Sequence, residues 1–354
     1  MAANGKKRYV VVGAGGRARV FTDPLTKHYA DRAELVAMCD PNPGRLAFYN
    51  ELLAGELGYH KVPTYSHEQF DQMIRETKPD TVLVCTVDQF HHEYIIRALE
   101  AGCDAVTEKP LTTDAPKCNA ILQAVKKTGK QLRVAHNYRW TPGTSLVKKL
   151  LKEKVVGEVL SVNLEYLLDV RHGADYFRRW HRQKENSGGL MIHKASHHFD
   201  LVNWWLNAMP ETVMGFGRLA FYGKENATKR GETVKYDRYT GNDTEGDPFA
   251  YKLDEQSESV RKLYLESEKY DGYHRDQNVF GEGITIEDTM SVLVKYRTGV
   301  TLNYSLNAFL PREGYHVSFN GTQGRLEYTE DHSSHIITGD SEEQLAAATA
   351  WKNR

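Results

Sequence analysis

The chain lacks three features that mark large classes of protein. No apolar stretch approaches the roughly 18 to 20 residues of a membrane-spanning helix. The run at residues 9–12, which follows a short basic N-terminus, is too brief for the core of a signal peptide. Lys+Arg total 46 against 47 for Asp+Glu, which leaves a net charge of -1 and no basic excess to hold a nucleic-acid backbone. We therefore expect neither a membrane nor a nucleic-acid partner.

Cysteine is also scarce. The four cysteines are Cys39, Cys85, Cys103 and Cys118, and they form neither a C-x-x-C pair nor a zinc-binding spacing. Buried, reduced thiols are therefore expected, as in a cytoplasmic protein. An exported form that has lost its leader remains an alternative. No metal site is predicted from the cysteines.

The first part of the 354-residue chain alternates strand and helix patterns. Short β-rich apolar runs occupy residues 8–12, 35–39, 81–86, 104–107 and 131–135. Helical patterns lie between them, most clearly at residues 92–102 and 115–127. This alternation is typical of βαβ units and predicts a parallel-sheet α/β domain over residues 1–137.

The pattern changes after Tyr138, and a second, α+β domain is predicted over residues 138–354. Alternating strands are expected at residues 159–166, 212–221, 288–296, 299–306 and 315–319, with helices at 143–152 and 190–206. Few helices separate these strands, which predicts a largely antiparallel open sheet covered on one face by helices. Trp204 and Trp205 are expected to pack between sheet and helix. The polar residues 222–284 form a long excursion, partly helical around 254–269, and residues 331–354 show no obvious closing strand.

A glycine-rich turn follows the first predicted strand. Its sequence runs from Gly13 to Ala18 and fits the pattern G-x-G-x-x-A. In a Rossmann-type domain Gly13 permits the tight turn, Gly15 lets the backbone approach a pyrophosphate, and Ala18 allows the next helix to pack closely. A purely structural glycine turn would give the same hexapeptide.

Asp40 strengthens the dinucleotide hypothesis. It ends the second strand, 25 residues after Gly15, close to where such folds place a ribose-binding carboxylate. A carboxylate there accepts hydrogen bonds from the ribose hydroxyls and repels a 2′-phosphate, so NAD is predicted over NADP. Arg17 and Arg45 could stack on adenine or counter a phosphate. Asp40 could also cap the turn at residues 41–44, and both roles are compatible.

Several motifs occur in one order along the chain and together resemble the glucose–fructose oxidoreductase/inositol dehydrogenase (Gfo/Idh/MocA) family. They are Gly13 to Ala18, Asp40-Pro41, residues 86–91, residues 98–102, Glu108-Lys109-Pro110, residues 136–139, Gly188-Gly189, and His197 with Asp200. The resemblance covers residues 7–220 well and residues 286–329 more loosely. It implies a nicotinamide-dependent oxidoreductase acting on a carbohydrate or cyclitol, and a homodimer or homotetramer formed through the C-terminal sheet.

The resemblance also implies the site residues. Those expected to hold the cofactor are Gly13, Gly15, Gly16, Arg17, Ala18, Asp40, Arg45, Thr86, His91, Glu108 and Lys109. Lys109 would lie beside the nicotinamide in an interdomain cleft and meet His197 there. A histidine suits proton transfer from an alcohol near pH 7, and an ammonium stabilises developing alkoxide charge.

One position departs from the family. An Asp is usual four residues before the catalytic histidine, whereas this chain has His193 followed by Lys194. On a continuous helix His193, His197 and Asp200 would share one face. Which residue is the base is therefore open. We expect Lys109 and His197 to be catalytic, with His193 third. A metal held by His193, His197, His198 and Asp200 is an alternative, and so is a purely structural seam of histidines.

A donor-rich aromatic segment precedes the Gly188-Gly189 pair and suits a carbohydrate, although a dimer surface would use the same residues. The residues expected to bind substrate are Asn137, Tyr138, Arg139, Tyr176, Trp180, Lys194 and Asp200. The leading hypothesis is an NAD-dependent sugar or cyclitol dehydrogenase. The alternatives are an NAD-dependent glycoside hydrolase that works by transient oxidation and elimination, and a non-catalytic protein that senses the dinucleotide.

Overall fold

The computed structural model describes residues 5–333 and divides the chain into two compact units. The first unit contains residues 1–135, 185–188 and 252–275, and the second contains the remainder. Residues 252–275 thus belong to the first unit, although they lie within the excursion from the second predicted sheet. The short helix α8 (Lys184–Ser187) spans one of the points at which the chain changes unit.

The first unit is built on a six-stranded parallel sheet with the strand order β3-β2-β1-β4-β5-β6. The strands are β1 (Lys7–Val12), β2 (Ala33–Cys39), β3 (Thr64–Tyr65), β4 (Thr81–Val84), β5 (Asp104–Thr107) and β6 (Leu132–Val134). This is the order of a dinucleotide-binding fold, in which ligands lie beyond the carboxyl ends of the strands near the switch between β1 and β4. The predicted parallel α/β fold is confirmed. The two-residue strand β3 was not predicted.

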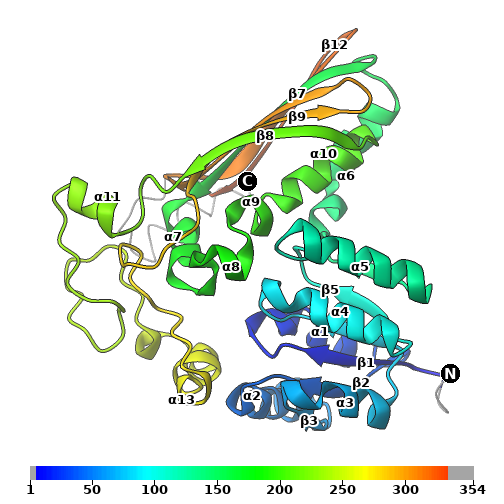
Figure 1. Cartoon of the computed structure of the whole chain (residues 1–354), viewed down its shortest axis with the longest axis vertical. Helices are drawn as coiled ribbons and strands as arrows, with labels where there is room; N and C mark the ends of the chain where they lie inside the picture. Colours follow the sequence, from blue (N-terminus) through cyan, green and yellow to red (C-terminus); the bar gives the residue numbers. More distant parts are fainter. Residues whose placement is uncertain (1–4, 334–354) are drawn as a thin grey trace. The chain divides into compact units, whose positions relative to one another are not determined.

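Helices cover both faces of this sheet. One face packs against α3 (Phe70–Thr77), α4 (His91–Glu100) and α5 (Ala115–Thr128), and the last two lie side by side (Figure 1). The other face packs against α1 (Arg19–Asp23), the short helix η2 (Pro24–His28) and α2 (Pro43–Ala54). Three further short helices follow strands or turns: η1 (Gly16–Ala18), η3 (His67–Gln69) and η4 (Asp88–Phe90). Strands buried on both faces explain the nearly continuous apolar runs of the sequence.

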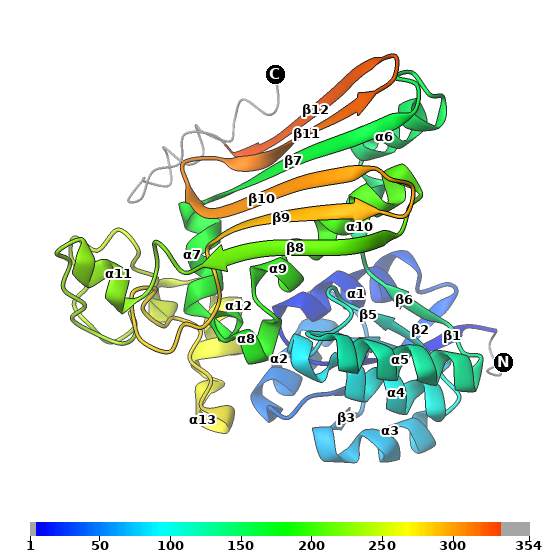
Figure 2. The ribbon, with the colours of Figure 1, turned by 45° about the horizontal axis from the view of Figure 1, so that its top comes forward.

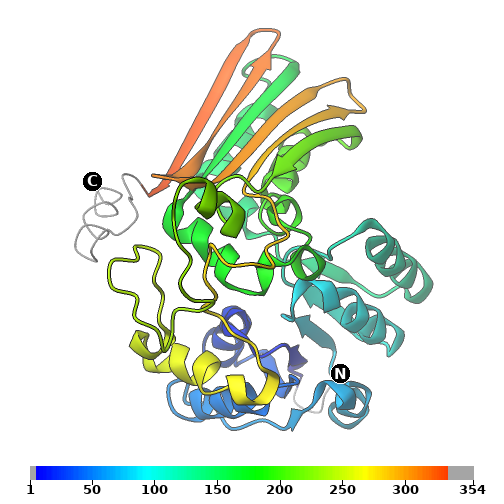
Figure 3. The same cartoon turned by 60° about the vertical axis from the view of Figure 1, so that its left-hand side comes forward.

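Four short helices of residues 252–275 complete the first unit. They are η7 (Leu253–Glu255), α12 (Glu258–Val260), η8 (Arg261–Leu265) and α13 (Glu268–Asp271). Figure 3 shows them in yellow beside the blue helices of the same unit. The helical character predicted around 254–269 is present, but it is broken into single turns.

The second unit is built on a six-stranded sheet with the order β12-β11-β7-β10-β9-β8 (Figure 2). Its strands are β7 (Val159–Asp169), β8 (Pro210–Arg218), β9 (Thr289–Tyr296), β10 (Thr301–Leu310), β11 (Glu313–Gly321) and β12 (Gly324–Ser333). Only the β7–β10 pair is parallel, so the largely antiparallel prediction is confirmed. β12 was not predicted, and residues 334–354 lie outside the described residues.

Helices cover one face of the second sheet. They are η5 (Asn137–Trp140), α6 (Pro142–Lys152), α7 (Val170–Arg178), α9 (Leu190–His193) and α10 (Ser196–Leu206). The short helix η6 (Trp180–Arg182) follows α7, and α11 (Lys224–Lys229) belongs to the excursion after β8, away from the sheet (Figure 2). Trp205 is buried in the core between this layer and the sheet, and Trp204 packs against that core, as predicted. The opposite face exposes mainly polar side chains, together with Phe216 and Met214 on the edge strand β8.

The predicted helix over residues 190–206 is wrong as a single element. It is divided into α9 and α10 at Lys194 and Ala195. The amide of Ala195 reaches back five residues to the carbonyl of Leu190, and that of His198 reaches back only three, to Ala195. His193 and His197 therefore do not sit on one continuous helix face.

All four cysteines are free thiols. Three of them are buried, and Cys118 is half-buried. Within the described residues, no helix combines the length and the apolarity that a bilayer crossing requires.

Candidate functional site

The glycine turn after β1 leaves room for a ligand at its second glycine. Gly13 has φ +94°, and a Cβ there would lie 2.5 Å from the carbonyl carbon of Cys85. A Cβ on Gly15 would meet nothing within 4 Å among the described residues. Gly13 is therefore required by close packing against the neighbouring strand, while Gly15 presents open backbone. This is the division of roles expected for a turn that cradles a pyrophosphate.

Asp40 is buried at the end of β2 and is held by the glycine turn. Its Oδ2 accepts from the amide of Ala14 at 2.6 Å, and its Oδ1 accepts from the amide of Asn42 at 2.8 Å. Burial raises the pKa of this carboxyl, and the two amides act in the opposite direction. The cap of α2 is Asn42, whose side chain accepts from the amides of Gly44 and Arg45. Asp40 thus holds the glycine turn through Ala14 and caps the turn at residues 41–44 through Asn42, as the alternative allowed, while Asn42 is the cap of α2.

The loops after β4 and β5 are tied together by His91. This histidine is fully buried, with its ring nitrogens 2.8 Å from the carbonyl oxygen of Pro110 and 3.1 Å from that of Thr86. Burial lowers its pKa to about 4, so the ring is neutral at pH 7. With no exposed surface, His91 fixes the loop that carries Lys109.

Glu108 precedes Lys109 at the end of β5. It is buried, and its Oε1 lies 2.9 Å from Nε of Arg17, which belongs to the glycine turn. Its Oε2 accepts from the amide of Lys109 at 3.3 Å. The predicted residues Arg17, Glu108 and Lys109 are therefore joined at one edge of the first sheet.

The predicted substrate residues of the second unit lie close together. The ring of Tyr138 stacks on that of His197 with centroids 4.1 Å apart and planes 9° apart. The hydroxyl of Tyr138 lies 3.4 Å from the ammonium of Lys194. Lys194 is almost fully buried, and its ammonium lies 4.8 Å from the ring centroid of Tyr166. Tyr138 thus lies between the Lys194 ammonium and the His197 ring and contacts both.

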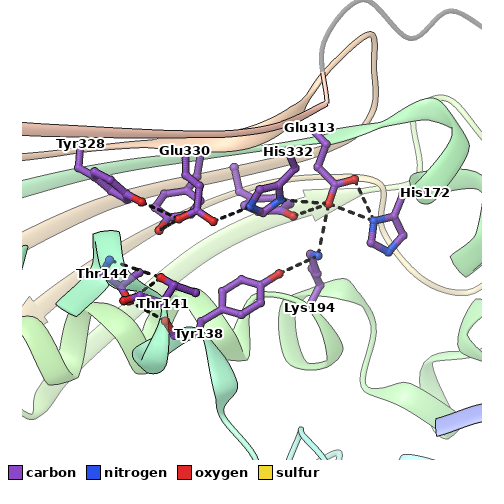
Figure 4. A network of polar contacts seen from close by, with 11 residues as sticks. Tyr138, Thr141, Thr144, His172, Lys194, Glu313, Tyr328, Glu330 and His332 are labelled. Atoms are coloured by element: carbon purple, nitrogen blue, oxygen red, sulfur yellow. Dashed lines mark hydrogen bonds and ion pairs between the residues drawn. The ribbon is translucent and has the colours of Figure 1, made fainter. Parts of the chain in front are cut away.

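Glu313, the first residue of β11, balances this buried charge (Figure 4). Its carboxylate lies 3.7 Å from Lys194, accepts from the Tyr166 hydroxyl at 2.8 Å, and lies 2.9 Å from Nδ1 of His172. Burial alone would raise the pKa of Glu313, but His172, His332 and Lys194 hold it well below its ordinary value. Burial of Lys194 favours the neutral amine, but Tyr176, Tyr138 and Glu313 outweigh this and raise its pKa. The pair is therefore ionised at neutral pH.

The network continues into β12. His332 lies 2.9 Å from Glu330 and 3.7 Å from Glu313. These carboxylates raise the pKa of His332 to about 9, while His332 and two tyrosine hydroxyls lower that of Glu330 to about 2. Figure 4 shows the histidine between the two glutamates.

His193 belongs to an aromatic cluster beside this network. Its ring centroid lies 4.3 Å from that of His181, 5.6 Å from that of Tyr176 and 5.9 Å from that of Trp180. The Tyr176 hydroxyl is 3.2 Å from Nε2 of His172, which joins the cluster to Glu313. Four residues predicted to be catalytic or substrate-binding, namely His193, Tyr176, Trp180 and Lys194, are thereby connected within one unit.

Other predicted residues have different surroundings. Arg139 and Asp200 pair with each other through two contacts, one of them at 2.6 Å between Nε and Oδ2, which fastens η5 to α10. This ion pair raises the pKa of Arg139. Asn137 is exposed. His198 is buried, stacks on Tyr166 and lies 2.8 Å from the Tyr304 hydroxyl, which places it in the core. Within residues 5–333 no group of three His, Cys, Asp or Glu side chains is arranged to hold a metal ion.

Sequence reasoning missed Glu313, Tyr166 and His332. A signal for Glu313 was present, because strand alternation places it on the same face as the inward residues Tyr315 and Val317. An acidic side chain on the buried face of a strand indicates a buried partner. The sequence around Glu313 does not show that this partner is Lys194, which is remote along the chain.

The residues of the first unit fit a dinucleotide. Gly15 presents open backbone, Asp40 lies at the ribose position of the fold, and the strand order is that of NAD-binding domains. The open backbone at Gly15 and the Asp40 carboxylate would hold the pyrophosphate and the ribose.

Comparison with known families agrees with this geometry. A family model described as "Oxidoreductase family, NAD-binding Rossmann fold" matches residues 7–136, and one described as "Oxidoreductase family, C-terminal alpha/beta domain" matches residues 148–350. The oxidoreductase-family protein YteT of Bacillus subtilis is 37% identical over 92% of this chain and 77% of its own length. The 2,7-anhydro-N-acetylneuraminate hydratase of Escherichia coli is 29% identical over 61% of this chain, but the match spans only 54% of that enzyme.

Two solved structures show the same fold. The WlbA dehydrogenase of Bordetella pertussis, in complex with NADH and UDP-GlcNAcA, has a TM-score of 0.65 at 19% identity and covers 92% of this chain and 80% of its own. The scyllo-inositol dehydrogenase of Lactobacillus casei, with bound NAD(H) and scyllo-inositol, has a TM-score of 0.63 at 17% identity over 96% and 81%.

Proposed function

Because this chain belongs to the Gfo/Idh/MocA family of NAD-binding oxidoreductases, we propose that it oxidises or forms a secondary alcohol of a sugar, sugar derivative or cyclitol. One observation supports this proposal most. In the second unit, direct contacts join His197, Tyr138 and Lys194, and Tyr176 contacts His193. Glu313 and His172 connect these two groups, so acid–base groups lie beside aromatic rings. Sugars and cyclitols suit such a surface, because their C–H faces pack on rings while their hydroxyls need donors and acceptors.

We propose that His197 is the base for the reacting hydroxyl and that Lys109 stabilises the charge that develops on its oxygen. A bound NAD supplies the acceptor for the hydride that leaves the carbinol carbon. His197 takes the hydroxyl proton in the direction of oxidation, and Lys109 donates a hydrogen bond to the same oxygen as negative charge develops there. Tyr138 orients the imidazole by stacking on it, and Lys194 keeps a positive charge near the reacting hydroxyl. His193 and Trp180 contact the sugar.

The first experiment identifies cofactor and substrate. The purified protein is denatured and any released nucleotide is identified by mass. A panel of neutral sugars, N-acetylated sugars, uronates and cyclitols is then screened with NAD for absorbance at 340 nm. Turnover of at least one member supports the proposal. The absence of turnover across the panel, in either direction and with bound NADH demonstrated, would contradict it.

Matched variants test the roles. Lys109→Met and His197→Asn should each lower kcat by about a hundredfold or more, the range for loss of an acid–base group. The controls are Lys126→Met on the exposed surface of α5 and His316→Asn on the open face of β11. His197→Asn should still bind NADH, because His197 lies outside the dinucleotide unit. Wild-type turnover in either catalytic variant would refute its assigned role.

A redox-neutral reaction is the second candidate. The second unit carries more acid–base groups than an alcohol oxidation needs, since His193, Lys194 and Tyr138 accompany His197. Transient oxidation followed by elimination would use such additional groups, as in an NAD-dependent glycoside hydrolase. Release of a glycosidic leaving group with no net absorbance change at 340 nm would favour this reaction. If Lys109→Ala left ligand binding and biological effect intact, a non-catalytic sensor would be favoured.

A further inference from the structure

Residues 252–275 pack on the loops that form the dinucleotide site. Leu263 of η8 is buried in the same core cluster as Ala14, Ala18 and Tyr49 of the first unit. η8 contacts α2, the helix that follows Asp40, and Figure 3 shows these segments side by side. A segment more than 200 residues away in sequence has therefore become part of the nucleotide-binding unit.

Three polar contacts of this segment reach the glycine turn and the start of α2. The hydroxyl of Tyr264 accepts from the amide of Gly16 at 3.1 Å, in the glycine turn. The carbonyl oxygen of Ser267 accepts from Nδ2 of Asn42 at 3.0 Å. Asp271, the last residue of α13, places Oδ2 2.8 Å from Nη1 of Arg45. All three contacts lie within a few residues of Gly15 or Asp40.

Arg45 is the cation that could recognise a 2′-phosphate, because an arginine shortly after the ribose-binding position serves NADP in folds of this type. Here the guanidinium is already engaged. It lies between Asp271 at 2.8 Å and Asp40 at 3.9 Å, its side chain is only 12% exposed, and its Nε donates to the carbonyl oxygen of Leu263. Two carboxylates and one guanidinium leave a local net charge of -1.

We propose that Asp271 is a coenzyme-specificity residue: it holds Arg45 in an ion pair and adds a second negative charge beside Asp40, so that the chain selects a dinucleotide without a 2′-phosphate. A 2′-phosphate carries close to two negative charges at pH 7 and would meet this net negative group. The ribose hydroxyls of NAD carry no charge and are compatible with it. The inference rests on dinucleotide binding by the first unit and does not depend on the sugar substrate.

The test measures binding without substrate. Dissociation constants for NADH and NADPH are determined by fluorescence titration for the wild type, Asp271→Asn and the matched control Asp254→Asn, an exposed aspartate of the same segment. The wild type should bind NADH more tightly than NADPH. Asp271→Asn should tighten NADPH binding by about tenfold or more and change NADH binding less than about threefold. Asp254→Asn should match the wild type.

Arg45 variants provide the decisive comparison. In the Asp271→Asn background, Arg45→Ala should abolish the tighter binding of NADPH, because that tighter binding comes from the Arg45 guanidinium that Asp271 no longer holds. In the wild-type background Arg45→Ala should not weaken NADPH binding, and this measurement holds even if Asp271→Asn does not fold. The proposal is overturned if Arg45→Ala alone weakens NADPH binding, if Asp271→Asn shifts both coenzymes equally, or if the wild type binds both equally. Loss of sugar turnover with unchanged coenzyme binding would count only against the proposed function.

Discussion

His332 makes the stability of the second unit depend on pH. Its pKa is raised from an ordinary 6.5 to about 9 by Glu313 and Glu330. A group whose pKa is raised on folding stabilises the protein fully below its unfolded pKa and loses that contribution as the pH rises through the folded pKa. The stabilisation from His332 should therefore be complete below about pH 6.5 and vanish above about pH 9.

The pKa values set the magnitude of this effect. A shift from 6.5 to about 9 corresponds to about 3 to 4 kcal/mol, at about 1.4 kcal/mol for each pH unit. The side chain of His332 is 26% exposed, so solvent screening makes this an upper value. We expect the free energy of unfolding to fall by about 2 to 3 kcal/mol between pH 6 and pH 9.5 through this one group.

The assay compares urea unfolding of the wild type, His332→Asn and His316→Asn at intervals from pH 6 to pH 10. His316 lies on the same sheet, but its side chain is 39% exposed and its distance to Glu327 is 4.0 Å. The difference between wild type and His332→Asn should be largest at pH 6 and close to zero at pH 10, while His316→Asn should follow the wild type. A constant difference across this range would refute the assignment of the proton to His332.

Four further variants test individual residues. Gly13→Ala should destabilise the protein by about 3 kcal/mol or more, since φ is +94° and the new Cβ would lie 2.5 Å from a backbone carbon. Gly15→Ala should fold normally in thermal unfolding yet weaken NADH binding about tenfold, and equal stability of the two variants would contradict the distinction. Tyr138→Phe keeps the ring stacked on His197 but removes the hydroxyl that lies 3.4 Å from Lys194. We therefore expect kcat to fall about tenfold with little change in KM. A change in KM alone would show that the hydroxyl binds substrate and takes no part in the reaction. Phe216→Ser on the exposed edge strand β8 should reduce the sedimentation coefficient if the second sheet pairs copies of the chain, and an unchanged value would count against this predicted contact.

The parts of the site that sequence could predict depend on short-range chemistry. Gly13 and Gly15 are identifiable because a turn and a close backbone approach are properties of consecutive residues. Asp40 is identifiable because it ends a strand whose neighbours are also predictable. Glu108 and Lys109 follow the same logic at the end of β5. In each case the residue lies at or just after the end of a predicted strand, so predicting the strand also predicts where the residue lies in the fold.

The parts that sequence could not predict depend on contacts between distant segments. Asp271 contacts Arg45 across more than 200 residues, and the polar composition and weak periodicity of its segment gave no sign that it packs on the first domain. The break between α9 and α10 was hidden by an apolar periodicity that continues through Lys194. That break follows from tertiary packing, because the ammonium of Lys194 lies against Tyr166 and Glu313 of the sheet.

The exchange of the family's usual aspartate for His193 is understandable in terms of charge. A buried ammonium without a nearby carboxylate is strongly destabilising, so Lys194 requires an acidic neighbour. Glu313 meets this requirement from β11, a strand remote in sequence. The Glu313 carboxylate therefore lies beside Lys194 and His172, while His193 packs among aromatic rings. Under the proposed function, this placement of the carboxylate leaves His193 to contact the substrate, and it assigns the acid–base chemistry of this unit to His197, Tyr138 and Lys194.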